Sequence, residues 1–253
     1  MKYKLLKILA VLLVFTALFN PFFVSAEGSC HWYIKRRGRE CPTFPPEAEK
    51  VSENGGFYVG KSGEKKIYLT FDAGYENGNV EKILDTLNQE NVPAAFFLLD
   101  NIIIKNPDLI KRMADEGHLV CNHTRNHKNL SSSSKEEIRQ NLYSLEKICL
   151  EKTGVEMAKY FRFPEGRYSI DAIKSVNELG YKTVFWSFGY DDWDNQRQPD
   201  TEKAIAKILS NTHDGAVILL HPTSKTNADI LPTLIKEWRK MEYSFGTLDE
   251  LTK

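Results

Sequence analysis

The chain has 253 residues, which suits one large domain or two small ones and allows a substantial core. It has 34 basic and 34 acidic residues, and 42% of its residues are hydrophobic, as in soluble globular proteins. A neutral chain without a long basic stripe is not expected to bind nucleic acid.

The N-terminus has the pattern of a secretory signal peptide. A basic start, MKYKLLK, precedes the apolar run ILAVLLVFTALF, and small residues follow up to Ala26. An uncleaved membrane anchor is the alternative, but the run is short for a bilayer span and Asn20 and Pro21 interrupt it. We predict that residues 1–26 are removed, which leaves a secreted or cell-wall-associated protein without a stable membrane span.

Residues 27–65 are rich in glycine, proline and charge, and their lack of periodicity predicts an irregular N-terminal arm. Cys30 and Cys41 lie in this arm and could close a disulfide loop in an oxidising medium. Cys121 and Cys149 lie in apolar segments and are expected to be buried thiols.

From Lys66 onward, apolar strand-like runs alternate with amphipathic helical patterns. Strands are expected at residues 67–71, 94–99, 118–122, 159–163, 181–189 and 215–221, and a last one within 243–251. Helices are expected at residues 80–92, 106–117, 134–154, 169–180, 201–211 and 228–241. This alternation predicts an α/β fold with a parallel sheet covered by helices, either doubly wound or closed into a barrel. No glycine-rich turn or Walker-type loop indicates nucleotide binding.

Local signals set several helix boundaries. Ser134, with Glu137 three residues later, predicts a capping box, and Gly154 predicts the end of the same helix. Thr201 is the expected cap of helix 201–211, and Pro232 is expected to break or kink the last helix.

Polar residues gather where the expected strands end, and ligand chemistry in parallel α/β folds lies at that edge. These residues are Asp72, Asn122, His123, His127, Arg162, Pro164, Asp191, Asp192, Trp193 and His221. Because they share one edge of the predicted sheet, the sequence indicates a single functional site.

His123 and His127 form a His-x-x-x-His pair that can converge on one metal ion. Such a pair alone is more often a surface or capping feature, but its position after a buried strand favours a metal site. His221 follows an apolar strand and suits a general acid, although a structural strand-end histidine is the alternative. Arg162 could hold Asp72 ionised, or it could form a structural salt bridge.

Asp192 could stabilise the charge of His221 in the same way. Three other histidines have no comparable context and receive no role: His31, His118 and His213.

From about Lys66 to its C-terminus, the chain resembles the polysaccharide deacetylases, carbohydrate esterase family 4. The resemblance rests on five motifs in order: TFDAG at 70–74, HTRNH at 123–127, RFPEG at 162–166, DW at 192–193 and LLH at 219–221. It implies a distorted (β/α) barrel of about seven parallel strands over residues 66–253, after the irregular arm.

The resemblance also implies the roles of the site residues. Asp72 would be the general base, positioned by Arg162, and His221 would be the general acid, tuned by Asp192. A divalent metal ion, usually zinc, would bind to His123 and His127. The residues implied in substrate binding are Trp193, Tyr75, Pro164 and Gly166.

Two positions depart from the family pattern. Ala73 replaces a second aspartate that is normally a metal ligand, and Gly189 replaces the first aspartate of the fourth motif. The segments TFDAGYENG, DEGHLVCNH, TVFWSF and LLHPTSKTNAD resemble a subgroup that deacetylates N-acetylmuramic acid in peptidoglycan. That subgroup often lacks the second aspartate and is associated with muramic δ-lactam formation in spore cortex.

The resemblance therefore implies an enzyme that removes acetyl groups from peptidoglycan glycan strands at N-acetylmuramic acid, and we expect it to be a monomer. Export would take it to the cell wall, or to the space between forespore and mother cell membranes. Deacetylation of N-acetylglucosamine in peptidoglycan or chitin is an alternative, as is an acetyl-xylan esterase. Ala73 motivates an alternative of another class, a non-catalytic glycan-binding module.

Overall fold

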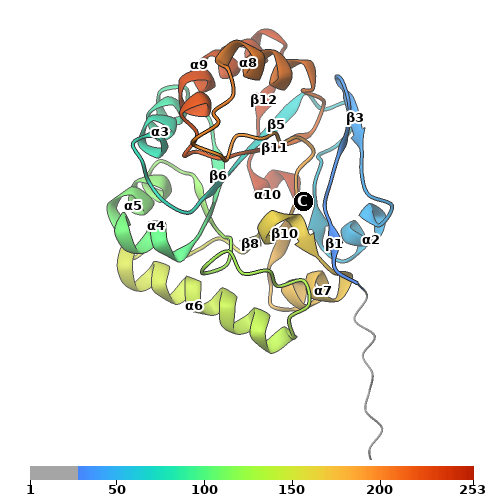
Figure 1. The fold of residues 1–253 in the computed structure, drawn as a ribbon, viewed down its shortest axis with the longest axis vertical. Helices are drawn as coiled ribbons and strands as arrows, with labels where there is room; N and C mark the ends of the chain where they lie inside the picture. The colour runs from blue at the N-terminus through green and yellow to red at the C-terminus, as the bar shows by residue number, and fades with distance from the viewer. Residues whose placement is uncertain (1–27) are drawn as a thin grey trace, which may run out of the picture.

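Seven parallel strands curl into an open barrel in the computed structural model, which describes residues 28–253 (Figure 1). In sheet order they are β11 (Ala216–Leu220), β5 (Lys66–Ala73), β6 (Ala94–Leu98), β7 (Leu119–Asn122), β8 (Tyr160–Phe161), β10 (Lys182–Val184) and β4 (Gly56–Phe57). A further strand, β12 (Ser244–Phe245), pairs with the start of β5. The barrel is confirmed, and the predicted signal peptide lies outside the described residues.

The chain after β10 brings the two ends of this sheet together. The amides of Ser187 and Phe188 donate to the carbonyl of Val217 in β11, at 2.9 and 3.1 Å. Leu219 N donates back to the carbonyl of Phe188 at 2.8 Å. As a result, the loop that follows β10 runs beside the carboxyl end of β11. This places Asp192 of the loop next to His221, which follows β11.

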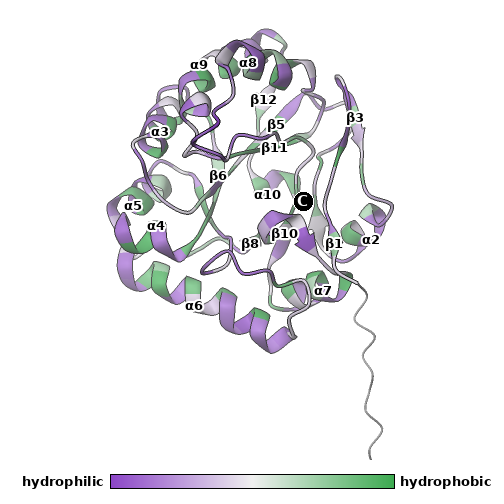
Figure 2. Ribbon diagram, in the orientation of Figure 1, coloured by the Kyte–Doolittle hydropathy of each residue, from purple (hydrophilic) through white to green (hydrophobic). Residues whose placement is uncertain are grey.

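Helices cover the outside of the barrel (Figure 1). They are α2 (Ala48–Glu53), α3 (Asn79–Gln89), α4 (Asp100–Lys105), α5 (Pro107–Asp115), α6 (Lys135–Thr153), α7 (Ile170–Glu178), α8 (Thr201–Ser210) and α9 (Lys225–Lys240). The short helix α10 (Leu248–Leu251) is instead drawn within the ring of strands, where Leu248 packs with Tyr68 and Phe97. Their outer faces are largely hydrophilic, whereas the strands inside are apolar (Figure 2). None of the described helices combines the length and the apolar character needed to cross a bilayer.

Most of the predicted helix boundaries are confirmed. Ser134 and Glu137 form the capping box of α6, and Gly154 ends that helix with a left-handed φ of 72°. The expected cap at Thr201 and the expected break at Pro232 were wrong, while the alternative of a kink at Pro232 stays a prediction. The cap of α8 is Asp200, whose carboxylate accepts from the amide of Lys203 at 3.0 Å, and α9 continues through Pro232. One lost backbone hydrogen bond does not end α9, because its long apolar face is buried against the sheet.

The N-terminal arm contains short elements that its sequence did not predict. They are β1 (Cys30–His31), β2 (Lys35–Arg37), β3 (Glu40–Thr43), α2 and β4, and β1 pairs with β9 (Arg167–Tyr168). Trp32 stacks on Phe185 at 4.5 Å, and its indole N–H donates to the carbonyl of Trp186 at 2.9 Å. The arm is thus packed along the carboxyl ends of the barrel strands.

The structure bears out the expectation for two of the four cysteines. Cys121 and Cys149 are fully buried, as predicted. Cys30 and Cys41 are not joined to each other in the described part of the chain. The arm is therefore held here by Trp32 and by strand pairing.

The capping box gives a test of the fold. We expect Ser134→Ala to lower the free energy of unfolding by about 1 kcal/mol, because an amide of the first turn of α6 loses its acceptor. Urea unfolding measures the change. Ser132→Ala, at an exposed position before the helix, is the control and should have no effect. An equal effect of both substitutions would contradict the role of the cap.

Candidate active site

Asp72 lies at the end of β5 and is paired with a fully buried arginine. Its Oδ1 accepts from Arg162 Nη1 at 2.7 Å. The same guanidinium donates from Nη2 to Thr70 Oγ1 at 2.9 Å and from Nε to the carbonyl of Val184 at 2.9 Å. It also lies 4.1 Å from the ring centroid of Phe97. Arg162 follows β8, and its guanidinium therefore connects the end of β8 to β5 and β10.

The Arg162 charge decides the protonation state of Asp72. Burial alone would raise the pKa of this carboxyl, but the charge of Arg162, the hydrogen bond that Arg162 donates and the charge of His221 outweigh it. The pKa of Asp72 is consequently below its ordinary value. Asp72 is ionised at neutral pH and is a weak base.

His123 and His127 lie next to Asp72. The ring centroids of the two histidines are 5.1 Å apart, and His123 Nε2 is 3.5 Å from Asp72 Oδ2. His123 Nδ1 lies 2.9 Å from the carbonyl of Arg162, so Nδ1 carries the proton and Nε2 keeps its lone pair. Burial lowers the pKa of His123 to about 4, which keeps the imidazole neutral as metal binding requires.

A tight turn carries this histidine pair. Thr124 and His127 both have left-handed backbone conformations, with φ of 71° and 60°. The amide of Thr124 donates to the side chain of Asn122 at 3.0 Å, and Asn122 in turn donates to the carbonyl of Leu142 in α6. Strained backbone of this kind persists where the surroundings over-determine it. The turn brings both imidazoles to the same edge of the barrel.

The second ionisable pair joins the loop after β10 to the end of β11. Asp192 Oδ1 lies 2.7 Å from His221 Nδ1, and Asp192 Oδ2 accepts from the His221 amide at 2.9 Å. Asn227 in α9 donates to the same carboxylate at 2.6 Å. Burial opposes the charged imidazole, but the bond to Asp192 and the charges of Asp192 and Asp72 raise the pKa of His221 above its ordinary value.

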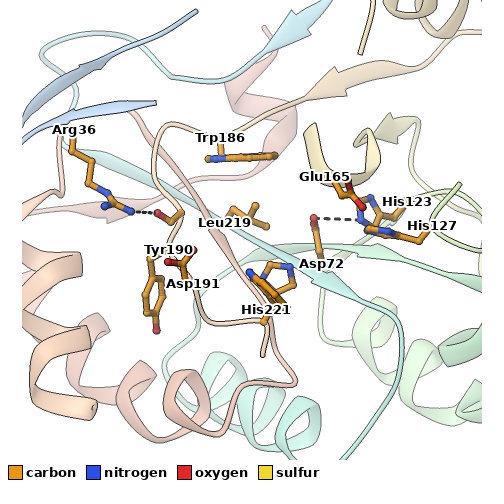
Figure 3. Close-up of a pocket in the computed structure, with 12 residues that line it drawn as sticks. Arg36, Asp72, His123, His127, Glu165, Trp186, Tyr190, Asp191, Leu219 and His221 are labelled. Carbon is orange, nitrogen blue, oxygen red and sulfur yellow. Dashed lines mark hydrogen bonds and ion pairs between the residues drawn. The ribbon is translucent and has the colours of Figure 1, made fainter. Parts of the chain in front are cut away.

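Both pairs open into one cleft of about 660 Å³ (Figure 3). Its lining residues are Arg36, Asp72, His123, His127, Glu165, Trp186, Gly189, Tyr190, Asp191, Trp193, Leu219 and His221. The structure thus brings Asp72, His221 and the two histidines together, with Arg162 and Asp192 buried behind them.

Of the four predicted substrate-binding residues, one lines the cleft and three do not. Trp193 lines the cleft and is 58% exposed. Tyr75 is exposed and bonded to Asn195, outside the cleft lining. Pro164 and Gly166 are buried in the short 3-10 helix η1 (Pro164–Gly166) behind it. Their roles in binding stay predictions.

Several residues of the cleft wall were not predicted from the sequence. Arg36 comes from the arm, Glu165 from η1, and Trp186 and Tyr190 from the loop after β10. Trp186 lies inside the expected strand 181–189 and Tyr190 directly follows it. An aromatic residue near a strand end was therefore the sequence feature that could have indicated both cleft residues. Nothing in the sequence of the arm indicated that Arg36 reaches the cleft.

Ala73 and Gly189 have structural consequences. Ala73 is 2% exposed and packs in the main core cluster. Among the described residues, no three His, Cys, Asp or Glu side chains are arranged as a metal site. Two imidazoles therefore fit a divalent ion whose remaining ligands are water or substrate, and they do not fit a site with three protein ligands. Gly189 contributes its carbonyl, which accepts from Arg36.

Comparison with known proteins places this site in a family. The model of the polysaccharide deacetylase family matches residues 59–184. The peptidoglycan-N-acetylmuramic acid deacetylase PdaA of Bacillus subtilis is 38% identical over 212 residues, 82% of this chain and 81% of PdaA. The chain belongs to the polysaccharide deacetylase family. Like other polysaccharide deacetylases, it is a hydrolase that acts on an amide bond.

Two further likenesses extend the comparison. The solved structure of B. subtilis PdaA, described as a family 4 carbohydrate esterase, superposes with a TM-score of 0.85 at 35% identity, and the match covers 89% of this chain and 97% of the chain in that structure. The peptidoglycan-N-acetylglucosamine deacetylase PgdA of Listeria monocytogenes is 34% identical over 81% of this chain, which spans 41% of PgdA. Members of the polysaccharide deacetylase family are generally metal-dependent.

The Asp192–His221 pair generates a prediction. We expect Asp192→Asn to lower the pKa of His221, which NMR titration of the labelled histidine measures. Because the folded pKa is raised, the pair stabilises the protein fully below the unfolded pKa of about 6.5, and that stability is lost as pH rises through the folded pKa. Asp192→Asn should therefore destabilise the protein more at pH 6 than at pH 9.

Asp191→Asn is the matched control, because it removes the same charge from the neighbouring position. It should change the His221 titration much less, since the hydrogen bonds to His221 come from Asp192. An equal shift in both variants would show that Asp192 acts only as a distant charge.

Proposed function

We propose that this protein removes the acetyl group from N-acetylmuramic acid in peptidoglycan glycan strands and releases acetate. The observation that supports this most is the pairing of opposite charge states in one cleft. Asp72 is held ionised by Arg162, while Asp192 favours the protonated state of His221. An amide hydrolase needs both states at once, one to accept a proton and the other to donate one.

We propose that His123 and His127 hold a divalent metal ion, and that this ion is zinc. The lone pair of His123 Nε2 is available, and neutral imidazoles are preferred ligands of zinc. When bound there, the ion would polarise the acetamide carbonyl and make a water molecule more acidic. The low pKa of Asp72 fits this arrangement, because a weak base takes a proton readily only from an acidified water.

The described residues then account for each proton. Asp72 takes a proton from the attacking water, whose oxygen bonds to the acetyl carbon. The carbon–nitrogen bond breaks, and the sugar nitrogen receives a proton from His221. Because His221 Nδ1 is engaged by Asp192, the donated proton is that of Nε2. The products are acetate and a free sugar amine.

The muramic acid substrate is supported by the similarity to PdaA, whose name carries that activity. The product would have an amine at C2 and a lactyl carboxylate on the oxygen at C3, the two groups that a muramic δ-lactam joins. We therefore propose that the protein acts in δ-lactam formation of the spore-cortex type. It would act after export, at the cell wall or between the forespore and mother cell membranes.

The catalytic assignment gives a first prediction. We expect Asp72→Asn and His221→Ala each to lower kcat/KM for acetate release by about 10²- to 10⁴-fold, the usual contribution of general acid–base catalysis. Acetate assay and mass spectrometry of peptide-free muramoyl glycans measure the loss. Asp115→Asn, at an exposed helix position, is the control. Undiminished acetate release in either site variant would refute the assigned roles.

The same assay separates the alternatives. Acetate release from chitooligosaccharides alone would favour an N-acetylglucosamine deacetylase, for which the 34% identity to PgdA is the supporting observation. Binding of glycans without acetate release, at saturating zinc, would favour a non-catalytic glycan-binding module.

The two-histidine site gives a second prediction, which concerns metal content. After gel filtration without added metal, we expect clearly less than one zinc per chain by mass spectrometry, because a carboxylate ligand is missing at Ala73. Calorimetry should show rebinding that His127→Ala abolishes. The exposed His31 provides the control variant His31→Ala. Stoichiometric zinc that survives gel filtration would mean that a further ligand exists.

A further inference from the structure

Arg36 is a cation of the N-terminal arm that lines the active-site cleft. Figure 3 shows it at one end of the cleft and the histidine pair with Asp72 at the other, with Trp186 and Leu219 between them. Arg36 lies before residue 59, where the match to the family model begins. Its presence in the cleft is thus a property of the arm.

The guanidinium of Arg36 has donors to spare. Its Nη2 donates to the carbonyl of Gly189 at 2.6 Å, and the group lies 5.5 Å from the ring centroid of Phe188. This is the single hydrogen bond of its side chain to the described residues, although a guanidinium carries five N–H donors. The remaining donors are available to a ligand in the cleft.

Arg36 also lacks the carboxylate partner that neighbouring arginines have. Arg37 pairs with Glu40 at 2.6 Å, and Arg167 pairs with Glu165 at 2.8 Å. Within residues 28–253, no carboxylate forms an ion pair with Arg36. Arginine remains charged at every relevant pH. This end of the cleft therefore presents an uncompensated positive charge.

The acidic residues of the cleft do not remove this charge. Glu165 is paired with Arg167 and is drawn beside the histidines, at the far end from Arg36 (Figure 3). Asp191 lines the cleft near Tyr190 and forms no ion pair with Arg36. The cleft thus has Asp72, Glu165 and the histidine pair at one end, and at the other end a guanidinium that no carboxylate of the described residues pairs with.

We propose that Arg36 binds the lactyl carboxylate of a muramoyl residue and is a specificity-determining residue of this enzyme. The inference rests on the proposed function, because muramoyl and glucosaminyl residues differ only in that lactyl ether. A guanidinium binds a carboxylate through two parallel N–H bonds, which adds selectivity as well as affinity. A chitin chain has no group for Arg36 to bind.

The carboxylate can come from either of two sugars of the strand. It belongs either to the muramoyl residue that is deacetylated or to the next muramoyl residue along the alternating chain. Both sources present the same carboxylate. A disaccharide with one muramoyl residue and a tetrasaccharide with two distinguish them, because only the longer glycan can supply the neighbouring group.

Binding to the Asp72→Asn form, in which turnover is slow, gives the test. Calorimetry would compare a peptide-free muramoyl tetrasaccharide, its lactyl methyl ester and chitotetraose. We expect the free acid to bind about tenfold more tightly than the ester, the usual effect of one charge-assisted hydrogen bond. Arg36→Gln should remove this difference, and Arg36→Lys should keep part of it.

Two features of the design separate binding from structure. Glutamine retains an N–H donor for the carbonyl of Gly189, so the loop after β10 keeps a partner. Arg37→Gln removes an arginine from the same strand, outside the cleft lining, and should leave the preference intact. In the active enzyme, Arg36→Gln should raise KM for the free-acid glycan and leave kcat nearly unchanged.

Equal binding of acid and ester by the unsubstituted Arg36 protein would overturn the inference, as would an unchanged preference in Arg36→Gln. The proposed function fails separately. Acetate release from chitotetraose alone would refute the proposed function, whether or not Arg36 selects the muramoyl carboxylate in the binding experiment. Conversely, acetate release from muramoyl glycans that is insensitive to Arg36 would refute the inference alone.

Discussion

The buried guanidinium of Arg162 is the group on which the site depends. The guanidinium donates to Asp72 and Thr70 in β5 and to the carbonyl of Val184 in β10. The backbone carbonyl of Arg162 lies against Nδ1 of His123. One residue thereby sets the position of the base, its charge and the tautomer of a predicted metal ligand. Removing one partner of a buried ion pair typically costs about 3–5 kcal/mol, because the other charge is left without compensation.

The two ionised pairs keep their separate charges because each has its own counter-ion. Without these counter-ions, a proton would pass from His221 to Asp72. Asp72 could then no longer act as a base, and His221 could no longer act as an acid. Arg162 makes the ionised state of Asp72 favourable, and Asp192 does the same for the protonated state of His221. The loop after β10 makes this possible, since its pairing with β11 brings Asp192 to His221.

The sequence was most informative where a local rule applies. The capping box at Ser134 and the helix-covered parallel sheet followed from short-range patterns, whereas the barrel followed from the family resemblance. The strand-end rule brought Asp72, Arg162 and His221 together correctly. The sequence was least informative where contacts join distant segments. The reach of Arg36 into the cleft depends on how an aperiodic arm packs, which Trp32 and Phe185 decide. No local pattern records that contact.

The most direct test of this account is the titration of the Asp72 carboxyl. Carbon-13 NMR of aspartate-labelled protein, with Asp72→Asn to assign the signal, gives its pKa. The account predicts that Asp72 stays ionised to a pH below the value of an ordinary aspartate, about 3.9. A pKa above that value would mean that burial outweighs Arg162, and it would contradict the role of Arg162 in holding the base ionised.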